Sequence, residues 1–342
     1  MMKMNTMRTM IKKVPIPICG LVLAIASLGN LVKPFSSMLH TVYGVVAWAL
    51  FALFLLKLIT HPKMVAEDLK NPIIASASGT CPMAMMVLST YAISFVGARG
   101  AYYMWLFAIA LHLTLIFYFS LRFMRRLDLK NVYASYFIVY VGLAVAAVTA
   151  PSHGAEALGR LSLVVAFPAL FLIGALVFYR YHKLPEVADA AKPLFCITAA
   201  PTSLCLAGYL QSATAPSLAV VLCLLVAATL IYAFVLVRAI GYIQTLAFYP
   251  SYAGFTFPFV ICPTAAYQAL LYLEAGGTTL FALKALVFFE ALVGVAFVTY
   301  ALLRYLSFLG RDAETLAWRE DNCTQTHLIG IFPYQLCSDE AE

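Results

Sequence analysis

Charge is scarce in this sequence, and so are the motifs of catalysis. Only 11% of the 342 residues are charged and 63% are hydrophobic, whereas about 25% of the residues of a soluble domain are charged. The chain contains no GxxxxGK[ST] phosphate loop and no HExxH zinc motif. Since it offers no recognisable acid–base pair either, neither an enzyme nor a cofactor is predicted.

The cysteines and histidines also lack the spacing of a metal site. None of the eight cysteines forms a CxxC pair, and six of them fall in hydrophobic segments, where cysteine is a small packing residue. None of the six histidines is spaced to meet another. His112 falls in the middle of a hydrophobic segment, and we interpret it as a hydrogen-bonded structural residue rather than a ligand.

Long hydrophobic segments fill almost the whole chain. A helix of about twenty apolar residues crosses the roughly 30 Å of a bilayer's hydrocarbon core. Ten such segments can be placed at 17–34, 39–59, 73–96, 102–123, 133–150, 157–181, 193–213, 216–238, 250–273 and 279–308. They predict an all-α polytopic membrane protein. Its parts are an N-terminal cytoplasmic segment at 1–14, a ten-helix transmembrane domain at 15–308 and a cytoplasmic tail at 309–342.

The basic residues collect on alternate connections between these segments. Of the 22 lysines and arginines, 18 share one predicted side, and four lie toward the other, namely Lys33, Arg99, Arg160 and Lys284. Because cytoplasmic loops collect lysine and arginine, both termini are predicted to be cytoplasmic. The net charge of +7 is therefore attributed to topology, and no nucleic-acid partner is predicted.

Prolines recur in the hydrophobic segments at a regular interval. They stand at Pro17, Pro82, Pro201 and Pro258, with intervals of 65, 119 and 57 residues. The long interval is about twice the others, so one proline is missing near Tyr140. Each period holds two membrane-length segments, which predicts five helical hairpins.

The two segments of each hairpin differ in composition. The first is rich in small residues, and the second is bulkier and more uniformly apolar. Small residues let helices approach closely or leave space for a lumen, and an interior proline kinks a helix. The pattern predicts an inner ring of five kinked helices around a pore, and an outer ring of five. The alternative is that small residues and proline are merely frequent in transmembrane helices.

The predicted inner ring carries almost no fixed charge. Such a lumen cannot hold a substrate by strong ion pairs. It suits small anions that bind weakly and are selected by desolvation and by the dipoles of broken helices. The main charges inside the segments are Lys284 and Glu290, both in the last one. Two interpretations of Glu290 stay open, a proton-coupling carboxylate and a structural hydrogen-bonding group.

The ninth segment contains the sequence FTFPF. At about 100° per residue, Phe255 and Phe259 share one helix face, and Phe257 projects to the opposite side. A phenylalanine held over a narrow pore would block it and exclude water, which is one way that channels gate. The pattern also fits three rings that all pack against neighbouring helices.

Three inner-helix segments are distinctive: VPIPICGLVLAIASLGNL, GTCPMAMMVLSTY and PSYAGFTFPFVI. They resemble the tellurite-resistance/dicarboxylate transporter family, which includes bacterial TehA and the plant slow anion channels. The resemblance covers roughly residues 14–308. It implies a homotrimer with one pore in each protomer, formed by five inner helices inside five outer ones. It also implies that Phe257 is the gate and that Gly20 is the pore-facing glycine of the first helix.

We therefore predict a bacterial inner-membrane anion channel, or a channel-like transporter, that passes small inorganic or organic anions. The alternative is a proton-coupled C4-dicarboxylate carrier of the malate type, or a carrier that exports sulfite or tellurite. The predicted pore-lining or kink positions are Pro17, Gly20, Pro82, Gly142, Pro201 and Pro258. The chain departs from the family pattern in the fifth segment, which lacks a proline, and at 252–255, where YAGF replaces the usual aromatic pair.

Overall fold

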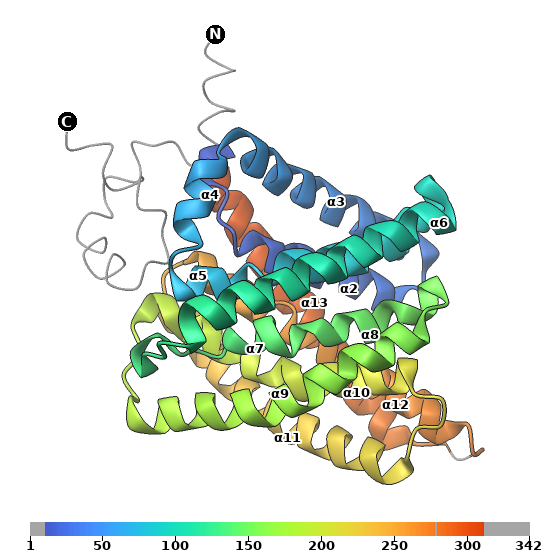
Figure 1. The fold of residues 1–342 in the computed structure, drawn as a ribbon. Coiled ribbons are helices and arrows are strands. Elements are labelled where there is room, and N and C mark those ends of the chain that lie inside the picture. Colours follow the sequence, from blue (N-terminus) through green and yellow to red (C-terminus); the bar gives the residue numbers. More distant parts are fainter. Residues whose placement is uncertain (1–10, 278, 311–342) are drawn as a thin grey trace, which may run out of the picture.

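The computed structural model describes residues 11–277 and 279–310, and every regular element in this part of the chain is a helix (Figure 1). Most of the predicted N-terminal segment at 1–14 falls outside these residues. Nearly all of the predicted tail at 309–342, including Cys323 and Cys337, also lies outside the described residues.

The α-helices follow one another with short connections. In chain order they are α2 (Ile18–Val32), α3 (Ser37–Thr60), α4 (Pro62–Asp68), α5 (Pro72–Ala77), α6 (Thr80–Phe119), α7 (Tyr136–Tyr140), α8 (Val145–Thr149), α9 (Glu156–Lys183), α10 (Ala200–Ser212), α11 (Leu218–Thr245), α12 (Pro258–Glu274) and α13 (Phe281–Gly310). Between them lie a π-helical turn, η1 (Ser120–Met124), and the 3-10 helices η2 (Leu129–Asn131), η3 (Gly142–Ala144), η4 (Ala150–His153), η5 (Asp189–Ala199) and η6 (Pro250–Phe255).

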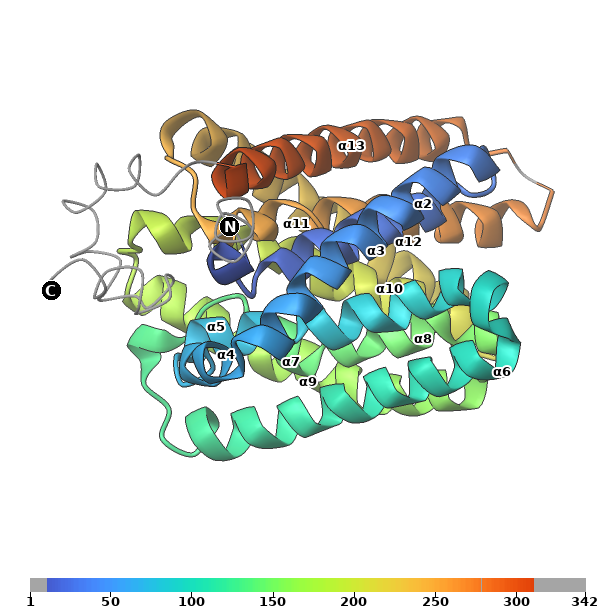
Figure 2. The same ribbon diagram turned by 90° about the horizontal axis from the view of Figure 1, so that it is seen from above.

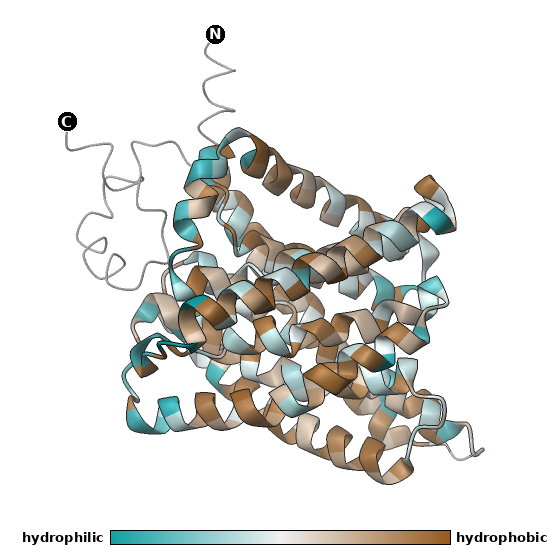
Figure 3. Ribbon diagram, viewed as in Figure 1, coloured by the Kyte–Doolittle hydropathy of each residue, from teal (hydrophilic) through white to brown (hydrophobic). Residues whose placement is uncertain are grey.

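Much of the described chain is built to lie in a bilayer. Seven helical stretches are long and apolar enough to cross one: Ser37–Thr60, Pro72–Met124, Glu156–Lys183, Asp189–Ser212, Leu218–Thr245, Pro250–Glu274 and Phe281–Gly310. Hydrophobic residues predominate along the helices (Figure 3), and many large ones are exposed, such as Phe178 on α9, which is 75% exposed. The prediction of an all-α membrane protein is confirmed. The count of ten spans stays a prediction.

The longest helix, α6, is two helical arms. A straight helix of 40 residues would be about 60 Å long, twice the thickness of a hydrocarbon core. At Gly97 the backbone has φ 75° and ψ 166°, a conformation that glycine adopts readily, and the chain turns back there (Figure 2). Met83 on the first arm and His112 on the second consequently both approach Gly142.

The four periodic prolines begin helices rather than kink their interiors. Pro17 is the N-cap of α2, and Pro82 lies in the first turn of α6. Pro201 is the second residue of α10, and Pro258 is the first residue of α12. Proline fits there because the first N–H groups of a helix have no intrahelical partner. The expected interior kinks are therefore breaks, each preceded by a turn or by a short helix such as α5, η5 or η6.

The fifth hydrophobic segment is broken without a proline. There α7 ends at Tyr140, η3 makes a single 3-10 turn from Gly142, and α8 follows it. Gly142 lies 60 residues after Pro82 and 59 before Pro201. The break therefore falls where the periodic pattern lacks its proline.

The broken segments are the most enclosed parts of the bundle. In an apolar run of 18 residues within Asp189–Ser212 and within Pro250–Glu274, 78% and 67% of the residues are buried, whereas the corresponding runs of the other five membrane-length stretches have 22–33% buried. Contacts run from α2 to α6, on to α8, α10 and α12, and from α12 back to α2. Each broken segment also packs against the helix that follows it, as α2 does against α3 and α12 against α13. In Figure 1, α3 lies along one margin and α9 and α11 along the other.

Candidate anion pore

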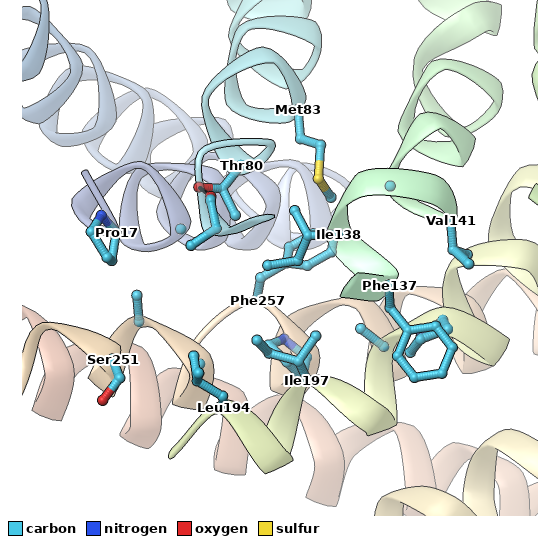
Figure 4. A pocket seen from close by; sticks show the side chains of 18 of the residues that line it. Pro17, Thr80, Met83, Phe137, Ile138, Val141, Leu194, Ile197, Ser251 and Phe257 are labelled. Atoms are coloured by element: carbon cyan, nitrogen blue, oxygen red, sulfur yellow. Dashed lines mark hydrogen bonds between the residues drawn. The ribbon is translucent and has the colours of Figure 1, made fainter. Parts of the chain in front are cut away.

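A cavity lies where the five broken segments meet. Its volume is about 60 Å³. Every broken segment contributes lining residues near its break (Figure 4). Six of the residues predicted from the sequence line it, namely Pro17, Gly20, Gly142, Pro201, Phe257 and Pro258.

The lining of this central cavity is almost entirely apolar. Only Thr80 and Ser251 bring polar side chains to it, and both hydroxyls are already bonded. Thr80 Oγ1 donates to the carbonyl of Ala77 at 2.7 Å, and Ser251 Oγ donates to the carbonyl of Ala190 at 2.5 Å. An ion in the cavity would meet no fixed charge of the lining, so binding there is weak and desolvation is the main cost.

The three phenylalanines of FTFPF separate as their helical spacing predicts. The rings of Phe255 and Phe259 both contact Phe297 on α13, with centroid distances of 6.1 Å and 4.4 Å. Phe257, at the N-cap of α12, instead lines the central cavity and is 7% exposed. Figure 4 draws it in the middle of the lining side chains. The rings of Phe255 and Phe259 therefore anchor this break to α13, and the ring of Phe257 lies in the cavity.

The first segment packs tightly against the chain leading to Phe257. Thr256 Oγ1 donates to the carbonyl of Ala253 at 2.7 Å and lies 3.3 Å from the carbonyl oxygen of Gly20. A Cβ atom added to Gly20 would lie 3.2 Å from the Cβ atom of Ala253 and 3.7 Å from Cγ2 of Thr80. Glycine at position 20 is thus what lets α2 approach η6 at the cavity.

Two of the predicted site residues do not line the central cavity. Pro82 lies buried in the first turn of α6, and Thr80 and Met83 line the cavity in its place. Glu290 is 2% exposed on α13 and lines a separate space of about 10 Å³ with Cys262, among others. Its Oε2 atom has no hydrogen-bond partner among the described residues.

Two lysines inside the hydrophobic segments have acidic partners near segment ends. Lys284 lies 3.1 Å from Glu274. Lys57 is fully buried, donates to the carbonyl of Val14 at 2.6 Å, and lies 3.9 Å from Asp68 on α4. Burial raises the pKa of Asp68, and the ammonium of Lys57 partly offsets that rise. Within the described ranges no three His, Cys, Asp or Glu side chains gather in a way that could hold a metal ion.

Sequence reasoning missed the residues that line the cavity ahead of three of the breaks. These are Ile73, Ile74 and Ala77 before α6, Phe137 and Ile138 in α7, and Leu194 and Ile197 in η5. All are apolar residues in apolar segments, so only their distance from the break marks them. His112 is hydrogen-bonded, as expected: its Nε2 lies 2.9 Å from the carbonyl oxygen of Val139.

Broken apolar helices around an internal cavity, in a protein covered by hydrophobic residues, define a membrane channel or transporter. Residues 13–307 match the model of the SLAC1 family, described as voltage-dependent anion channel, and the chain belongs to that family. The resemblance stated from the sequence is confirmed over nearly its whole extent. The family is one of anion channels and transporters and not of enzymes. A comparison with characterised proteins found no match.

Proposed function

We propose that this protein conducts small anions through a pore in each protomer and that Phe257 closes the pore. The observation that carries the proposal is the meeting of five helix breaks in one apolar cavity that Phe257 lines. The other predicted lining positions, Gly20, Gly142, Pro17, Pro201 and Pro258, act by shaping this cavity. Pro82 acts by starting α6 beside the cavity.

The proposed pore has ten transmembrane segments arranged as five hairpins. The turn at Gly97 supports the count, because it divides α6 into two arms. The broken fifth segment and the 15-residue α2 supply two further crossings that a length criterion leaves out. The closed order of contacts from α2 through α6, α8, α10 and α12 back to α2 supports an inner ring.

The closing role of Phe257 rests on where its side chain lies. The ring occupies a cavity without charged lining and comes from a helix start that the contacts of Phe255 and Phe259 with Phe297 fix to α13. An apolar ring in a narrow apolar passage blocks ions sterically and makes the passage unfavourable for water. The pore is therefore closed at this depth until the ring moves.

The broken helices favour anions over cations. The helices α2, α6, α10 and α12 have 15, 40, 13 and 17 residues and begin beside the cavity. The N-terminus of a helix carries the equivalent of about half a positive charge. In a passage with no carboxylate, these dipoles lower the energy of an anion and raise that of a cation.

A proton-coupled carrier of C4-dicarboxylates, or an exporter of sulfite or tellurite, is the second candidate. The buried Glu290, with one oxygen lacking a partner, is the group that would take up the proton. Glu290 does not line the central cavity. A carboxylate that couples proton to substrate needs access to the substrate path, so the position of Glu290 favours the channel.

The surroundings of the pore are proposed from the sequence and the family. We place the protein in a bacterial inner membrane as a homotrimer, with both termini cytoplasmic. The charge bias of 18 basic residues against four supports the orientation. Cross-linking in native membranes, with three subunits as the expected limit, tests the trimer separately from conduction.

The experiment that tests the function is anion flux into liposomes. Wild-type protein and Phe257→Ala are reconstituted and compared for chloride, nitrate, sulfite and malate, with and without a proton gradient. The channel proposal predicts flux driven by the membrane potential alone and larger in Phe257→Ala. Flux that saturates and requires a proton gradient would favour the carrier, and the absence of flux from both proteins contradicts both functions.

A further inference from the structure

A side chain from another helix contacts the backbone at the break in the fifth segment. His112, on the second arm of α6, is fully buried, and its Nε2 lies 2.9 Å from the carbonyl oxygen of Val139. A carbonyl only accepts, so Nε2 carries the proton and donates. The other ring nitrogen, Nδ1, has no partner among the described residues. Among the described residues, the carbonyl of Val139 is therefore the one hydrogen-bond partner of the imidazole ring.

That carbonyl is the one that a continuous helix would use to bridge the break. In an uninterrupted α-helix Val139 would accept from the N–H of Leu143, four residues later. Instead Gly142–Ala144 form a 3-10 turn, in which Ala144 donates to Val141 at 2.9 Å. At the other four breaks a proline removes an N–H and stops the preceding helix from continuing. In the fifth segment every N–H is present, so the broken form needs another source of stability.

The packing around Gly142 joins His112 to the cavity. A Cβ atom at position 142 would lie 2.7 Å from Sδ of Met83 and 3.2 Å from Cε1 of His112. Gly142 itself lines the cavity, together with Ile138 and Val141. The imidazole ring thus lies directly behind the cavity wall that the break creates.

We propose that His112 takes the place of the missing fifth proline. By donating to Val139 it keeps the fifth segment broken at the depth of Phe257, and it thereby positions the wall formed by Ile138, Val141 and Gly142. His112 is a positioning residue, since it does not line the cavity itself. The inference rests on the proposed conduction path for its effect on current, but the broken backbone can be measured without any current.

The backbone test is hydrogen–deuterium exchange of a peptide covering residues 136–149 in detergent-solubilised full-length protein. His112→Leu removes the donor and keeps an apolar side chain. We expect slower exchange in this peptide, because the amide of Leu143 can then bond Val139. His40→Leu is the matched control, since His40 also contacts a backbone carbonyl of an inner helix, that of Gly29, at 3.2 Å. The control should leave this peptide unchanged.

A proline at the vacant position supplies the rescue. Gly142→Pro would remove one N–H of a continuous helix, and its ring would clash with the carbonyl of Ile138, four residues earlier, so the helix could not continue through the break. The thioether of Met83 is flexible enough to yield space. The double variant His112→Leu/Gly142→Pro should restore the exchange rate of the wild type. A merely space-filling role of His112 predicts no such rescue. If His112→Leu does not fold, the double variant should, and failure of both to fold contradicts the proposal.

The functional test uses Phe257→Ala as the open background. Adding His112→Leu should lower single-channel conductance about threefold to tenfold, the effect of one hydrogen bond on the equilibrium that it controls, and Gly142→Pro should restore it. If Phe257→Ala itself carries no current, the proposed function fails, and the exchange experiment still decides the role of His112. Unchanged exchange and conductance in His112→Leu overturn the inference.

Discussion

Replacing Phe257 by alanine should open the pore. The ring is 7% exposed and lines a cavity of about 60 Å³. Removing its six carbons leaves room for about three more water molecules, at about 30 Å³ each. Water can then occupy the level that the ring now keeps dry, so the barrier to an ion falls.

The expected size of the effect follows from the barrier. A decrease of about 1.4 kcal/mol raises the rate of crossing about tenfold, and we expect at least this increase in anion current. Truncating a buried phenylalanine costs about 3–5 kcal/mol of stability. Phe257 should fall at the low end of this range, because one side of its ring already faces the cavity.

The assay is current in planar bilayers at matched protein density, with thermal unfolding measured in parallel. Phe255→Ala is the control. Phe255 is fully buried, its ring lies 5.0 Å from that of Tyr252 and 6.1 Å from that of Phe297, and it does not line the cavity. It should lose stability without gaining current. Equal currents in wild type and Phe257→Ala, with both folded, would refute the gate.

Three further predictions concern other parts of the molecule. Gly20→Asp in the Phe257→Ala background should lower the current about tenfold, since a carboxylate at the cavity repels anions, and an undiminished bilayer current would count against a pore-facing Gly20. Glu290→Gln should leave potential-driven flux unchanged, whereas loss of pH-dependent uptake in liposomes would support the carrier. Burial lowers the pKa of His153, so its contribution to stability is present above its ordinary pKa of about 6.5 and is lost as pH falls. Between about pH 7.5 and pH 5 the midpoint of thermal unfolding should therefore fall more in wild type than in His153→Gln, and equal slopes would exclude this cause.

The sequence predicted the positions of the helix breaks better than their form. Pro17, Pro82, Pro201 and Pro258 marked four of them and Gly142 the fifth. Their nature as helix starts depends on short elements such as α5, η5 and η6, whose boundaries follow from packing between segments rather than from local propensity.

The separation of the phenylalanine rings agrees with the prediction from α-helical spacing, although Phe255 lies in the 3-10 helix η6 and Phe257 is the N-cap of α12. The contacts of Phe255 and Phe259 with Phe297 on α13 contribute to it. The number of membrane spans, by contrast, depends on whether helices or hydrophobic segments are counted. A length rule applied to the described helices finds seven stretches, for three reasons. It counts the two arms of α6 once, α2 has only 15 residues, and the fifth segment is divided among pieces of five residues or fewer. Hydropathy along the chain does not register such breaks, and it therefore gives ten segments.

The partner of His112 could not be predicted from the chain. Val139 lies 27 residues away, on a segment whose broken backbone is itself a product of tertiary contacts. A buried histidine in a hydrophobic segment indicates a hydrogen bond but not its acceptor. The absence of a proline set the fifth segment apart in the sequence, but it did not identify the helix that contacts that segment.

The most direct test of the account is the reversal potential of Phe257→Ala in a chloride gradient. With tenfold more chloride on one side and an impermeant organic cation, the account predicts a reversal potential near the chloride equilibrium value, about 59 mV in magnitude for a monovalent ion. Adding Gly20→Asp should reduce the current without reversing its sign. A reversal potential near zero, or one that follows the cation gradient, would contradict an anion pore at this cavity.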